Sequence, residues 1–489
     1  MAHSAVISKY ELEREKNIKK NEELLASLNL LQQKRNSISM LESSRKKLPR
    51  QSERQQLKAE PLRMKLRSRS SNDEEMAVSM HNEVLQDDKN TPERKTGTNS
   101  FIEILGQNNM DTIELDNILR RISNVRHTEN LSHISVTSST ERFKELQKYN
   151  ISDQGFLKVV PHRIYSVAFA YTAKPLALAG DKWGYLGIWS PLEEHQSSIV
   201  LTLQPHIRAI SKIFSHPTLD NQLLTCSYDG TVRILSLSHS ICDTLLDIED
   251  LLFYDMSCLD AGNCFLVASN AGKILFTDKR DPKSTQTILL HEKKISCVDI
   301  FPDQHTFCTC SGDRSVCIWD FRKISFDNQI KSTPIQTWLH SKAVTASRVS
   351  PSGKFILTTC YDNYLRVFQS PLSTAKNEDA LLYQIAHNNN TGRWITPFAA
   401  EWDPQNDNLF FCGSMEKPRG VDLFHMGKSL ETSRLVQENL TSIIPRLAVH
   451  PTTGMIVGGS SSGRMFSFAD CKYTSSIVDQ GPPQLPTQF

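Results

Sequence analysis

Apolar residues follow two different rhythms along this 489-residue chain. Before about residue 150 they are sparse and recur at helical spacing, most clearly between residues 8 and 31. After residue 155 they come in short β-prone runs that Gly, Asp, Asn and Pro interrupt. The pattern therefore predicts a polar N-terminal part with short helices, followed by a domain built almost wholly of strands.

The N-terminal part divides into a basic region and a connecting arm. Residues 8–31 predict an amphipathic helix that is too short and too charged to be stable alone. Residues 45–69 hold ten basic residues against Glu53 and Glu60, and Pro49 and Pro61 break any long helix, so we expect residues 1–100 to be disordered. Residues 101–154 are expected to be partly helical, with short helices in 101–106, 115–122 and 141–149 that can dock on a neighbour.

The strand-rich part contains an internal repeat. Each unit has a polar loop that often contains His, a strand, a turn, a second strand, a turn with Asp or a substitute, and a third strand with an aromatic or aliphatic end. The period of roughly 41 to 54 residues matches four-stranded propeller blades and no helical array. The units run from His162 through Asp181 to Trp189, from His206 through Asp229 to Leu235, through Asn270 to Phe276, from His291 through Asp313 to Asp320, from His340 through Asp362 to Phe368, from His387 to Asp422, and to residues 458–468.

We therefore predict an all-β fold, a seven-bladed WD-repeat β-propeller over residues 155–470, with a tail at 471–489. Blade seven shows only three strands, so residues 155–160 are expected to add the fourth and close the ring, which removes open sheet edges. The repeated His and Asp residues are interpreted as hydrogen-bonding within the blades. The alternative, a metal or acid–base role for them, has less support.

Charge and cysteine content exclude several classes of protein. The net charge is only +2, which argues against a bulk polycation, yet the cluster Arg45, Lys46, Lys47 and Arg50 predicts a nuclear-import signal and a phosphate-binding arm. The alternative interpretation of this basic cluster is a solvated linker.

All eleven cysteines lie between Cys226 and Cys471 without metal-ligand spacing, which indicates buried thiols and no metal. No secretion signal or bilayer-length apolar stretch is present, so we expect no membrane partner.

One stretch imitates an enzyme motif. Gly459, Ser461 and Gly463 satisfy the GxSxG pattern, but a strand pattern follows where the motif requires a helix. The glycines are typical of a propeller turn, and an esterase or nucleotidase is a distant alternative. We expect no enzyme activity, no cofactor and no small-molecule substrate.

A second short motif suggests a protein partner. Trp319, Asp320 and Arg322 at the end of blade four resemble the WDxR box by which propellers dock on the adaptor of cullin-4 ubiquitin ligases, damage-specific DNA-binding protein 1. Residues 277–280 in blade three match the same motif less closely and end in Arg280. An arginine can present a fork of donors to a carboxylate or to carbonyl oxygens. The alternative is a chance arginine after an ordinary repeat.

The loops resemble one family in particular. In residues 387–404, Gly392, Arg393 and Trp394 precede Ile395-Thr396-Pro397, and this stretch is similar to the lesion-probing hairpin of the damage-specific DNA-binding protein 2 type of WD-repeat protein. Residues 291–295, 340–344 and 180–184 are similar to its blade-four, blade-five and blade-one loops. One departure is Gly392, which stands where that family has a bulky aromatic residue, so Trp394 would supply the stacking surface.

The resemblance implies a nuclear protein that binds damaged or chemically modified duplex DNA, acts as a cullin-4 substrate receptor and has chromatin proteins as partners. It implies that basic residues at one mouth of the ring hold phosphates and that the loop tip probes the base. The residues so implicated are Arg163, Lys182, Trp183, Arg208, Lys293, Lys294, Lys342, Arg393, Trp394 and Arg446. The competing class is a protein-interaction scaffold, in which the same surfaces bind peptides and the N-terminal basic segment serves only import. A separate alternative for Trp394 is packing against the neighbours of its own loop.

Overall fold

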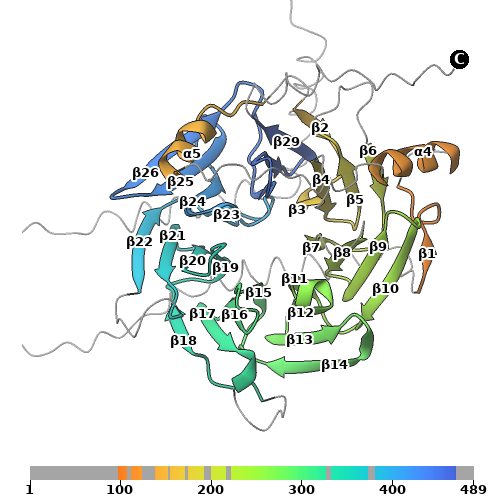
Figure 1. Cartoon of the computed structure of the whole chain (residues 1–489), viewed down its shortest axis with the longest axis horizontal. Helices are drawn as coiled ribbons and strands as arrows, with labels where there is room; N and C mark the ends of the chain where they lie inside the picture. The colour runs from red at the N-terminus through yellow and green to blue at the C-terminus, as the bar shows by residue number, and fades with distance from the viewer. Residues whose placement is uncertain are drawn as a thin grey trace, which may run out of the picture. The chain divides into compact units, whose positions relative to one another are not determined.

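A computed structural model of the chain describes residues 97–106, 112–123, 138–151, 155–170, 175–191, 200–215, 222–325, 332–372 and 380–469. The predicted helix at 8–31, the import cluster and the tail from residue 471 lie outside these residues. Seven antiparallel sheets surround a common axis (Figure 1). The inner strands of successive blades contact one another, and the last contacts the first, so the ring is closed.

Each blade contains four consecutive strands, except for the last blade. Blades one to three consist of β3 Ile164–Ala170, β4 Leu176–Asp181, β5 Leu186–Trp189 and β6 Val200–Leu203; β7 Ile210–Phe214, β8 Gln222–Ser227, β9 Thr231–Ser236 and β10 Ile241–Asp247; and β11 Phe253–Leu259, β12 Cys264–Ser269, β13 Lys273–Asp278 and β14 Asp281–Leu289. Blades four and five consist of β15 Ile295–Ile300, β16 Thr306–Ser311, β17 Ser315–Asp320 and β18 Gln336–Leu339; and β19 Val344–Val349, β20 Phe355–Cys360, β21 Tyr364–Gln369 and β22 Leu381–Ala386. Short 3-10 turns occupy Asp260–Gly262 and Phe321–Lys323.

Blade seven confirms the predicted ring closure. Blade six holds β23 Glu401–Asp403, β24 Asn406–Gly413, β25 Gly420–Met426 and β26 Leu430–Val436, and blade seven holds β27 Arg446–Val449, β28 Ile456–Gly459 and β29 Arg464–Phe468. Its outer strand is β2, Phe156–Lys158, which pairs with β29 in the register Phe156 to Phe466 and Lys158 to Arg464. The two ends of the domain are thus hydrogen-bonded to each other.

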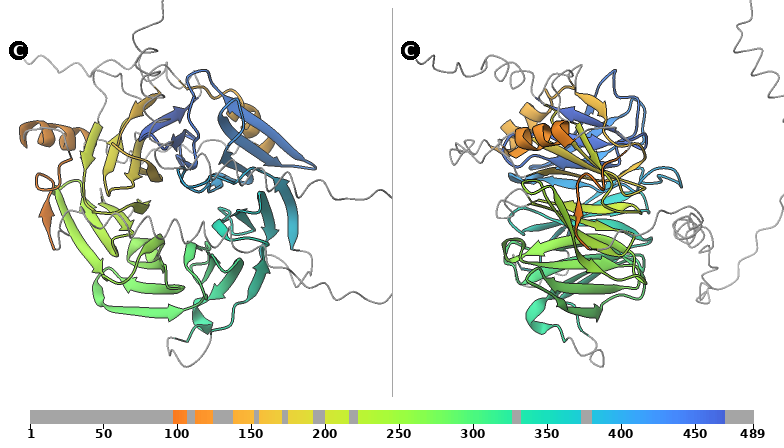
Figure 2. Two further views of the ribbon diagram at one scale, coloured as in Figure 1. Left: turned by 180° about the vertical axis from the view of Figure 1, so that it is seen from behind. Right: turned by 90° about the vertical axis from the view of Figure 1, so that its right-hand side faces the viewer.

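The arm before the propeller docks on its outer rim (Figure 2). The strand β1, Asn99–Ser100, pairs with β10 as a fifth strand of blade two. Residues 101–106 were expected to be helical but make a bridge to blade one, with the Gly106 amide donating to the Thr202 carbonyl at 2.9 Å. Six residues are too few for a stable helix, and the edge of β6 offers backbone partners instead. Helices α4 and α5 span Thr112–Ser123 and Ser139–Leu146.

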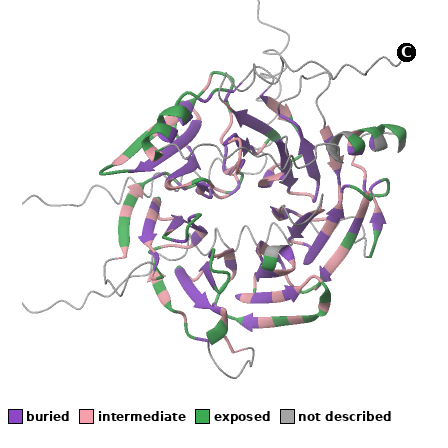
Figure 3. Cartoon of the chain, in the orientation of Figure 1, coloured by how far each residue is buried: buried purple, intermediate pink, exposed green. Residues whose placement is uncertain are grey.

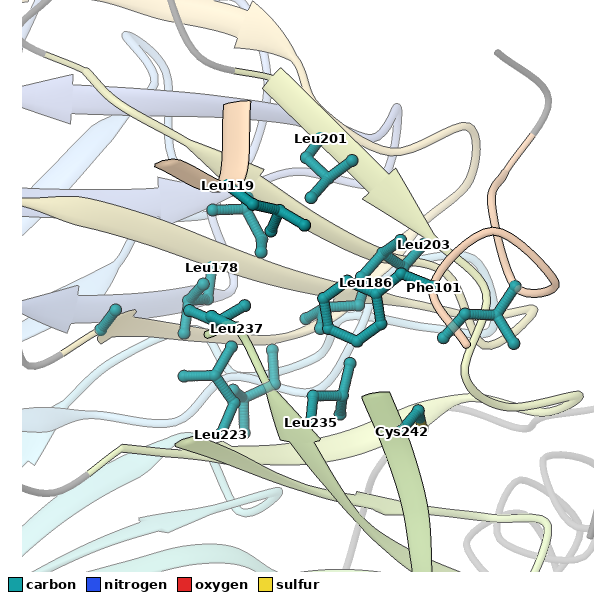
Figure 4. Close-up of a cluster of buried hydrophobic side chains, with 14 of the residues drawn as sticks. Phe101, Leu119, Leu178, Leu186, Leu201, Leu203, Leu223, Leu235, Leu237 and Cys242 are labelled. Atoms are coloured by element: carbon teal, nitrogen blue, oxygen red, sulfur yellow. The ribbon is translucent and has the colours of Figure 1, made fainter. Parts of the chain in front are cut away.

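Apolar side chains fill the spaces between blades. The burial pattern shows buried strands within the blades and more exposed outer strands (Figure 3). In the cluster between blades one and two, Phe101 from the arm is fully buried beside Leu186 and Leu203, and Leu119 of α4 packs on the same cluster (Figure 4). Phe143 and Leu146 of α5 pack in a second cluster with residues of blades six and seven. The arm therefore contributes to the core and is not only a linker.

Strand direction divides the connections between two faces. The loops from each outer strand to the next inner strand, together with the turns between second and third strands, lie at one end of the blades, here called the upper face. The remaining connections lie at the other end, the lower face. Backbone bonds such as His340 N to Arg314 O at 2.9 Å and His387 N to Asn363 O at 3.0 Å join the two kinds of upper connection.

Candidate nucleic-acid interface

All the residues that the family resemblance implicates in DNA contact lie at the upper face. Lys182 and Trp183 are in the turn between β4 and β5, and the other implicated residues are in or beside loops that connect successive blades. These loop residues are Arg163, Arg208, Lys293, Lys294, Lys342, Arg393, Trp394 and Arg446. The fold thus gathers cations that are almost 300 residues apart in sequence on one end of the ring.

The loop of residues 387–400 is anchored in blades five and one. It contains turns but no strands, so the expected hairpin is a loop. At its base the Asn389 side chain, 1% exposed, donates from Nδ2 to the Cys360 carbonyl at 2.9 Å and accepts at Oδ1 from the His387 Nδ1 at 2.6 Å. On its far leg the Thr396 hydroxyl donates to the Ile164 carbonyl at 2.6 Å. The loop therefore reaches past blade seven to blade one.

The base of this loop also contains a charged histidine. Burial opposes protonation of His387, but the neighbouring Cys412 and a hydrogen bond to Asp422, whose carboxylate lies 3.5 Å from the imidazole, outweigh burial and raise the pKa of His387 to about 11. Asp422 is in turn bonded by Arg434. A positively charged His387 paired with a carboxylate of blade six fixes the position where the loop begins.

The tip of the loop exposes one aromatic ring. Trp394 is 74% exposed, and the Arg393 guanidinium lies 5.4 Å from the centre of its ring. Gly392 has φ +62°, and a Cβ there would meet no atom within 4 Å. The alternative in which Trp394 packs against its own loop does not fit this exposure. The Arg393 carbonyl accepts from the Arg163 guanidinium at 3.0 Å, which ties the tip to blade one.

A row of tyrosines lies among these cations, and the sequence reasoning missed it. Tyr165 is 5.8 Å from Tyr228 between ring centres, and Tyr228 is 4.7 Å from Tyr254. Arg163 lies over Tyr165 at 5.0 Å, and the ammonium of Lys294 lies over Tyr254 at 4.8 Å. The place of each tyrosine within its repeat was the signal that could have revealed the row. Tyr165 and Tyr254 are the second residues of inner strands, and Tyr228 directly precedes a turn aspartate.

Burial sets the charge states of this row. It raises the pKa of Tyr228 and Tyr254 well above 10, and it raises the pKa of Tyr361, a neighbour of Tyr228 outside the row, to about 12, so these phenols stay neutral. Burial also lowers the pKa of Lys294, while Lys293 beside it is exposed. The two lysines, equivalent in the sequence interpretation, therefore differ: Lys293 points to solvent and Lys294 belongs to the aromatic row.

The lower face presents two matching arginine forks. The Arg322 guanidinium donates from Nε and Nη2 to the Asp320 carboxylate at 2.9 and 2.8 Å, and Arg280 does the same to Asp278 at 3.0 and 2.7 Å. Both arginine side chains are 68% exposed. These bonds lower the pKa of each aspartate to about 2. The similar motif in blade three therefore has the same geometry as the WDxR box in blade four.

The Trp319 side chain of the WDxR box is buried within blade four. Its ring is 2% exposed, and its indole N–H donates to the Thr309 hydroxyl at 2.8 Å. The same hydroxyl bonds His291, which also bonds Asp313 at 2.9 Å. A direct partner contact by the Trp319 side chain is therefore excluded in this conformation, and Asp320 and Arg322 form the accessible part.

The side chains of the His–Asp pairs are bonded to each other in blades two and four, whereas in blade one Asp181 accepts from the backbone amide of His162 at 3.2 Å. In blade two, His206 bonds Asp229 at 3.1 Å, as predicted. In blade five, Asp362 instead accepts from Arg366 at 2.7 Å and from Ser341 at 2.8 Å. Burial and the nearby Arg366 lower the pKa of His340 to about 4, so it is neutral. Arg366 on β21 takes the place at Asp362 that the histidine takes at the aspartate in blades two and four.

The structure also describes the cysteines and the GxSxG stretch. The ten described cysteines are free thiols, and Cys471 lies outside the described residues. Within the described ranges, no group of three or more His, Cys, Asp or Glu residues is arranged to hold a metal ion. Ser461 and Gly463 lie in the turn between β28 and β29, and a strand follows, as predicted. No helix among the described residues is long and apolar enough to span a membrane.

The comparisons with known proteins agree with this architecture. The WD domain, G-beta repeat family matches residues 197–236, 282–320 and 332–369. The closed ring of four-stranded blades and these matches make the chain a WD-repeat β-propeller protein. WD repeat-containing protein 76 of Xenopus laevis is 32% identical over 480 residues, which cover 95% of this chain and 80% of that protein. The same protein of Mus musculus is 31% identical over 94% of this chain and 74% of its own length.

The chain therefore belongs to the WD repeat-containing protein 76 family. A more distant relative is DNA damage-binding protein CMR1 of Scheffersomyces stipitis, which is 26% identical over 95% of this chain and all of its own length.

Proposed function

We propose that this protein is a nuclear, non-enzymatic DNA-binding propeller that recognises damaged or chemically modified bases. The observation that carries the proposal is the upper face, where Arg393 lies over the exposed Trp394 and where Arg163 and Lys294 lie over rings of the tyrosine row. Cations neutralise phosphates, and exposed aromatic rings stack on bases, which is the combination that nucleic-acid surfaces use. The names of the CMR1 relatives as DNA damage-binding proteins support the same function.

In this proposal, Lys182, Arg208, Lys293, Lys342 and Arg446 contact phosphates and set the position of the duplex. Arg393 and Trp394 contact the abnormal base. The cluster Arg45, Lys46, Lys47 and Arg50 directs nuclear import. The alternative, a chromatin-associated scaffold, would bind peptides at the same face without salt-dependent affinity for DNA.

The proposal has a second part, at the lower face. We propose that Arg322, with Arg280 beside it, binds the adaptor of a cullin-4 ubiquitin ligase and makes the protein a substrate receptor on chromatin. The support is geometric: two equivalent forks, each held by its own aspartate, leave most of each arginine side chain exposed on neighbouring blades. A preoriented arginine fork loses little freedom when it binds a carboxylate or carbonyl oxygens.

Salt dependence tests the DNA-binding part. Replacing both Lys293 and Lys342 with Ala should weaken binding to all duplexes similarly and reduce the slope of log K against log salt by up to about 2, because each lost phosphate contact removes about 0.9. The matched control replaces Lys283 and Lys354, which are exposed on the lower face, with Ala. Binding is measured by fluorescence anisotropy at several salt concentrations. Equal effects of the two pairs would contradict the upper-face interface, and absent DNA affinity would favour the scaffold.

A further inference from the structure

We propose that Arg163 is a positioning residue that holds the tip of the 387–400 loop, and that the loop so held presents a single ring suited to duplex DNA interrupted at one nucleotide. The ligand class is thus a duplex with one missing or unpaired base, in preference to a lesion that joins two neighbouring bases. This inference rests on the DNA-binding function proposed above.

The Arg163 guanidinium is already engaged inside the protein. Nη1 donates to the Arg393 carbonyl at 3.0 Å, and Nη2 donates to the Tyr165 hydroxyl at 2.6 Å. Tyr165 is 7% exposed, and its neighbour Tyr228 is 5.8 Å away between ring centres. One planar guanidinium bonds both the buried Tyr165 phenol and the backbone of the loop tip. Arg163 therefore holds residue 393 at a fixed position relative to the tyrosine row. A lysine has the charge but not the fork.

The two legs of the loop are fixed independently of Arg163. Asn389 is bonded to the Cys360 carbonyl in blade five, and Thr396 is bonded to the Ile164 carbonyl in blade one. Both residues are 1% exposed. Loss of the Arg163 contact should therefore free residues 391–395 without releasing the whole loop. That separation allows the role of the tip to be tested in a folded protein.

The exposed surface of the tip is one aromatic ring thick. Gly392 has no side chain and the Arg393 guanidinium is not an aromatic ring, so Trp394 is the one ring that the tip can insert into a base stack. Stacked bases are spaced about 3.4 Å apart, which is the thickness of one ring. One inserted indole therefore replaces one base, whereas displacement of two joined bases leaves a gap that it fills only in part. A missing or mispaired base also costs least to unstack.

The test uses the full-length chain and four matched duplexes: intact, with one abasic site, with one mismatch, and with one thymine dimer. Affinities are measured by fluorescence anisotropy over a range of salt. We expect the abasic and mismatched duplexes to bind about 5- to 100-fold more tightly than the intact one, as stacking of one base implies. The duplex with a thymine dimer should show a smaller gain in affinity over the intact duplex. A preference for the dimer over both single-nucleotide interruptions would overturn the assigned ligand class.

The variants separate positioning from phosphate binding. Arg163→Ala and Arg163→Lys should lose most of the preference for the abasic duplex and retain the salt slope, and Trp394→Ala should lose the preference completely. Arg208→Ala, a matched upper-face arginine, should instead lower the salt slope and keep the preference. If Arg163→Lys behaves like the unchanged protein while Arg163→Ala has a lower salt slope, Arg163 is a phosphate contact and the positioning role is wrong.

Hydrogen–deuterium exchange without DNA distinguishes failure of this inference from failure of the proposed function. The amides of residues 391–395 should exchange faster in Arg163→Ala and Arg163→Lys than in the unchanged protein, while β23 and β24 should exchange at the same rate. Unchanged exchange at the tip would overturn the positioning role even if DNA binds. If no duplex binds in a salt-dependent manner, the proposed function fails, and faster tip exchange still establishes the contact.

Discussion

At the scale of single residues, buried carboxylates determine how this propeller responds to acid. Asp229 is 7% exposed and bonds His206 at 3.1 Å and the Thr231 amide at 3.0 Å. Burial acts to raise its pKa, but His206 and these donors outweigh burial and hold the pKa of Asp229 well below 3.8. A carboxylate with a depressed folded-state pKa stabilises the fold above the unfolded pKa and loses that contribution as pH falls.

We therefore expect Asp229→Asn to reduce the free energy of unfolding at pH 7 by about 1–3 kcal/mol, because a buried hydrogen-bonded charge is removed. The difference from the unchanged protein should shrink as the pH is lowered from 5 to 3. Thermal unfolding at several pH values measures it, and Asp281→Asn, an exposed aspartate in β14, is the control. A difference that stays constant over this range would contradict the assigned charge state.

At the scale of elements, the N-terminal segments serve two different purposes. The strand β2 is part of the ring itself, because it completes blade seven through its pairing with β29. The arm from Asn99 to Gly106 lies outside the ring and joins the outer strands of blades one and two. Its anchor is Phe101, which is fully buried in the cluster between these blades.

Two phenylalanine variants should distinguish these purposes. Phe101→Ala should cost about 3–5 kcal/mol of arm docking and make the arm sensitive to limited proteolysis, with little change in the unfolding temperature of the ring. Phe466→Ala, at a buried position of β29 that faces Phe156, should lower that temperature clearly. Differential scanning calorimetry and timed proteolysis read out the two effects. An equal fall in unfolding temperature for both variants would show that the arm and ring unfold as one unit.

At the scale of the whole molecule, the alternating direction of the strands places the two proposed interfaces at opposite faces of the ring. Trp394 and its neighbouring cations are at the upper face, and Arg280 and Arg322 follow third strands at the lower face. Because the blades lie between them, each face can be altered without disturbing the other. A receptor that holds DNA on one face and a ligase adaptor on the other requires this separation.

We expect Arg322→Ala to reduce co-purification of the cullin-4 adaptor by several-fold and leave DNA affinity nearly unchanged. The reason is that the substitution removes an exposed fork without removing a core contact. The measurement is adaptor recovery beside DNA anisotropy, with circular dichroism to verify the fold. Lys323→Ala, the exposed neighbour in the same turn, is the matched control. Loss of DNA binding in Arg322→Ala would contradict the assignment of faces, and a larger effect of Arg280→Ala would move the contact to blade three.

The repeat was readable from the sequence because each blade is a local unit. His206 and Asp229, or His291 and Asp313, lie within one blade, so their spacing and the alternation of the strands indicate the fold without distant contacts. The same holds for Asp320 and Arg322, which are two residues apart. Residues 155–160 were predicted to close the ring because an incomplete blade leaves an open edge that needs a partner.

The tertiary structure alone decided the contacts between distant blades. Arg348 in blade five bonds Asp255 in blade three and Glu401 in blade six, and no local pattern marks these three as partners. Likewise, Arg163 meets Arg393 across 230 residues, and Tyr165, Tyr228 and Tyr254 come from three blades. Sequence periodicity reports which face of a strand is buried, but curvature of the closed ring determines which loops meet at its mouth. That is why the sequence could determine the blades and the chemistry of each loop, while closure of the ring decided how the loop tip is held.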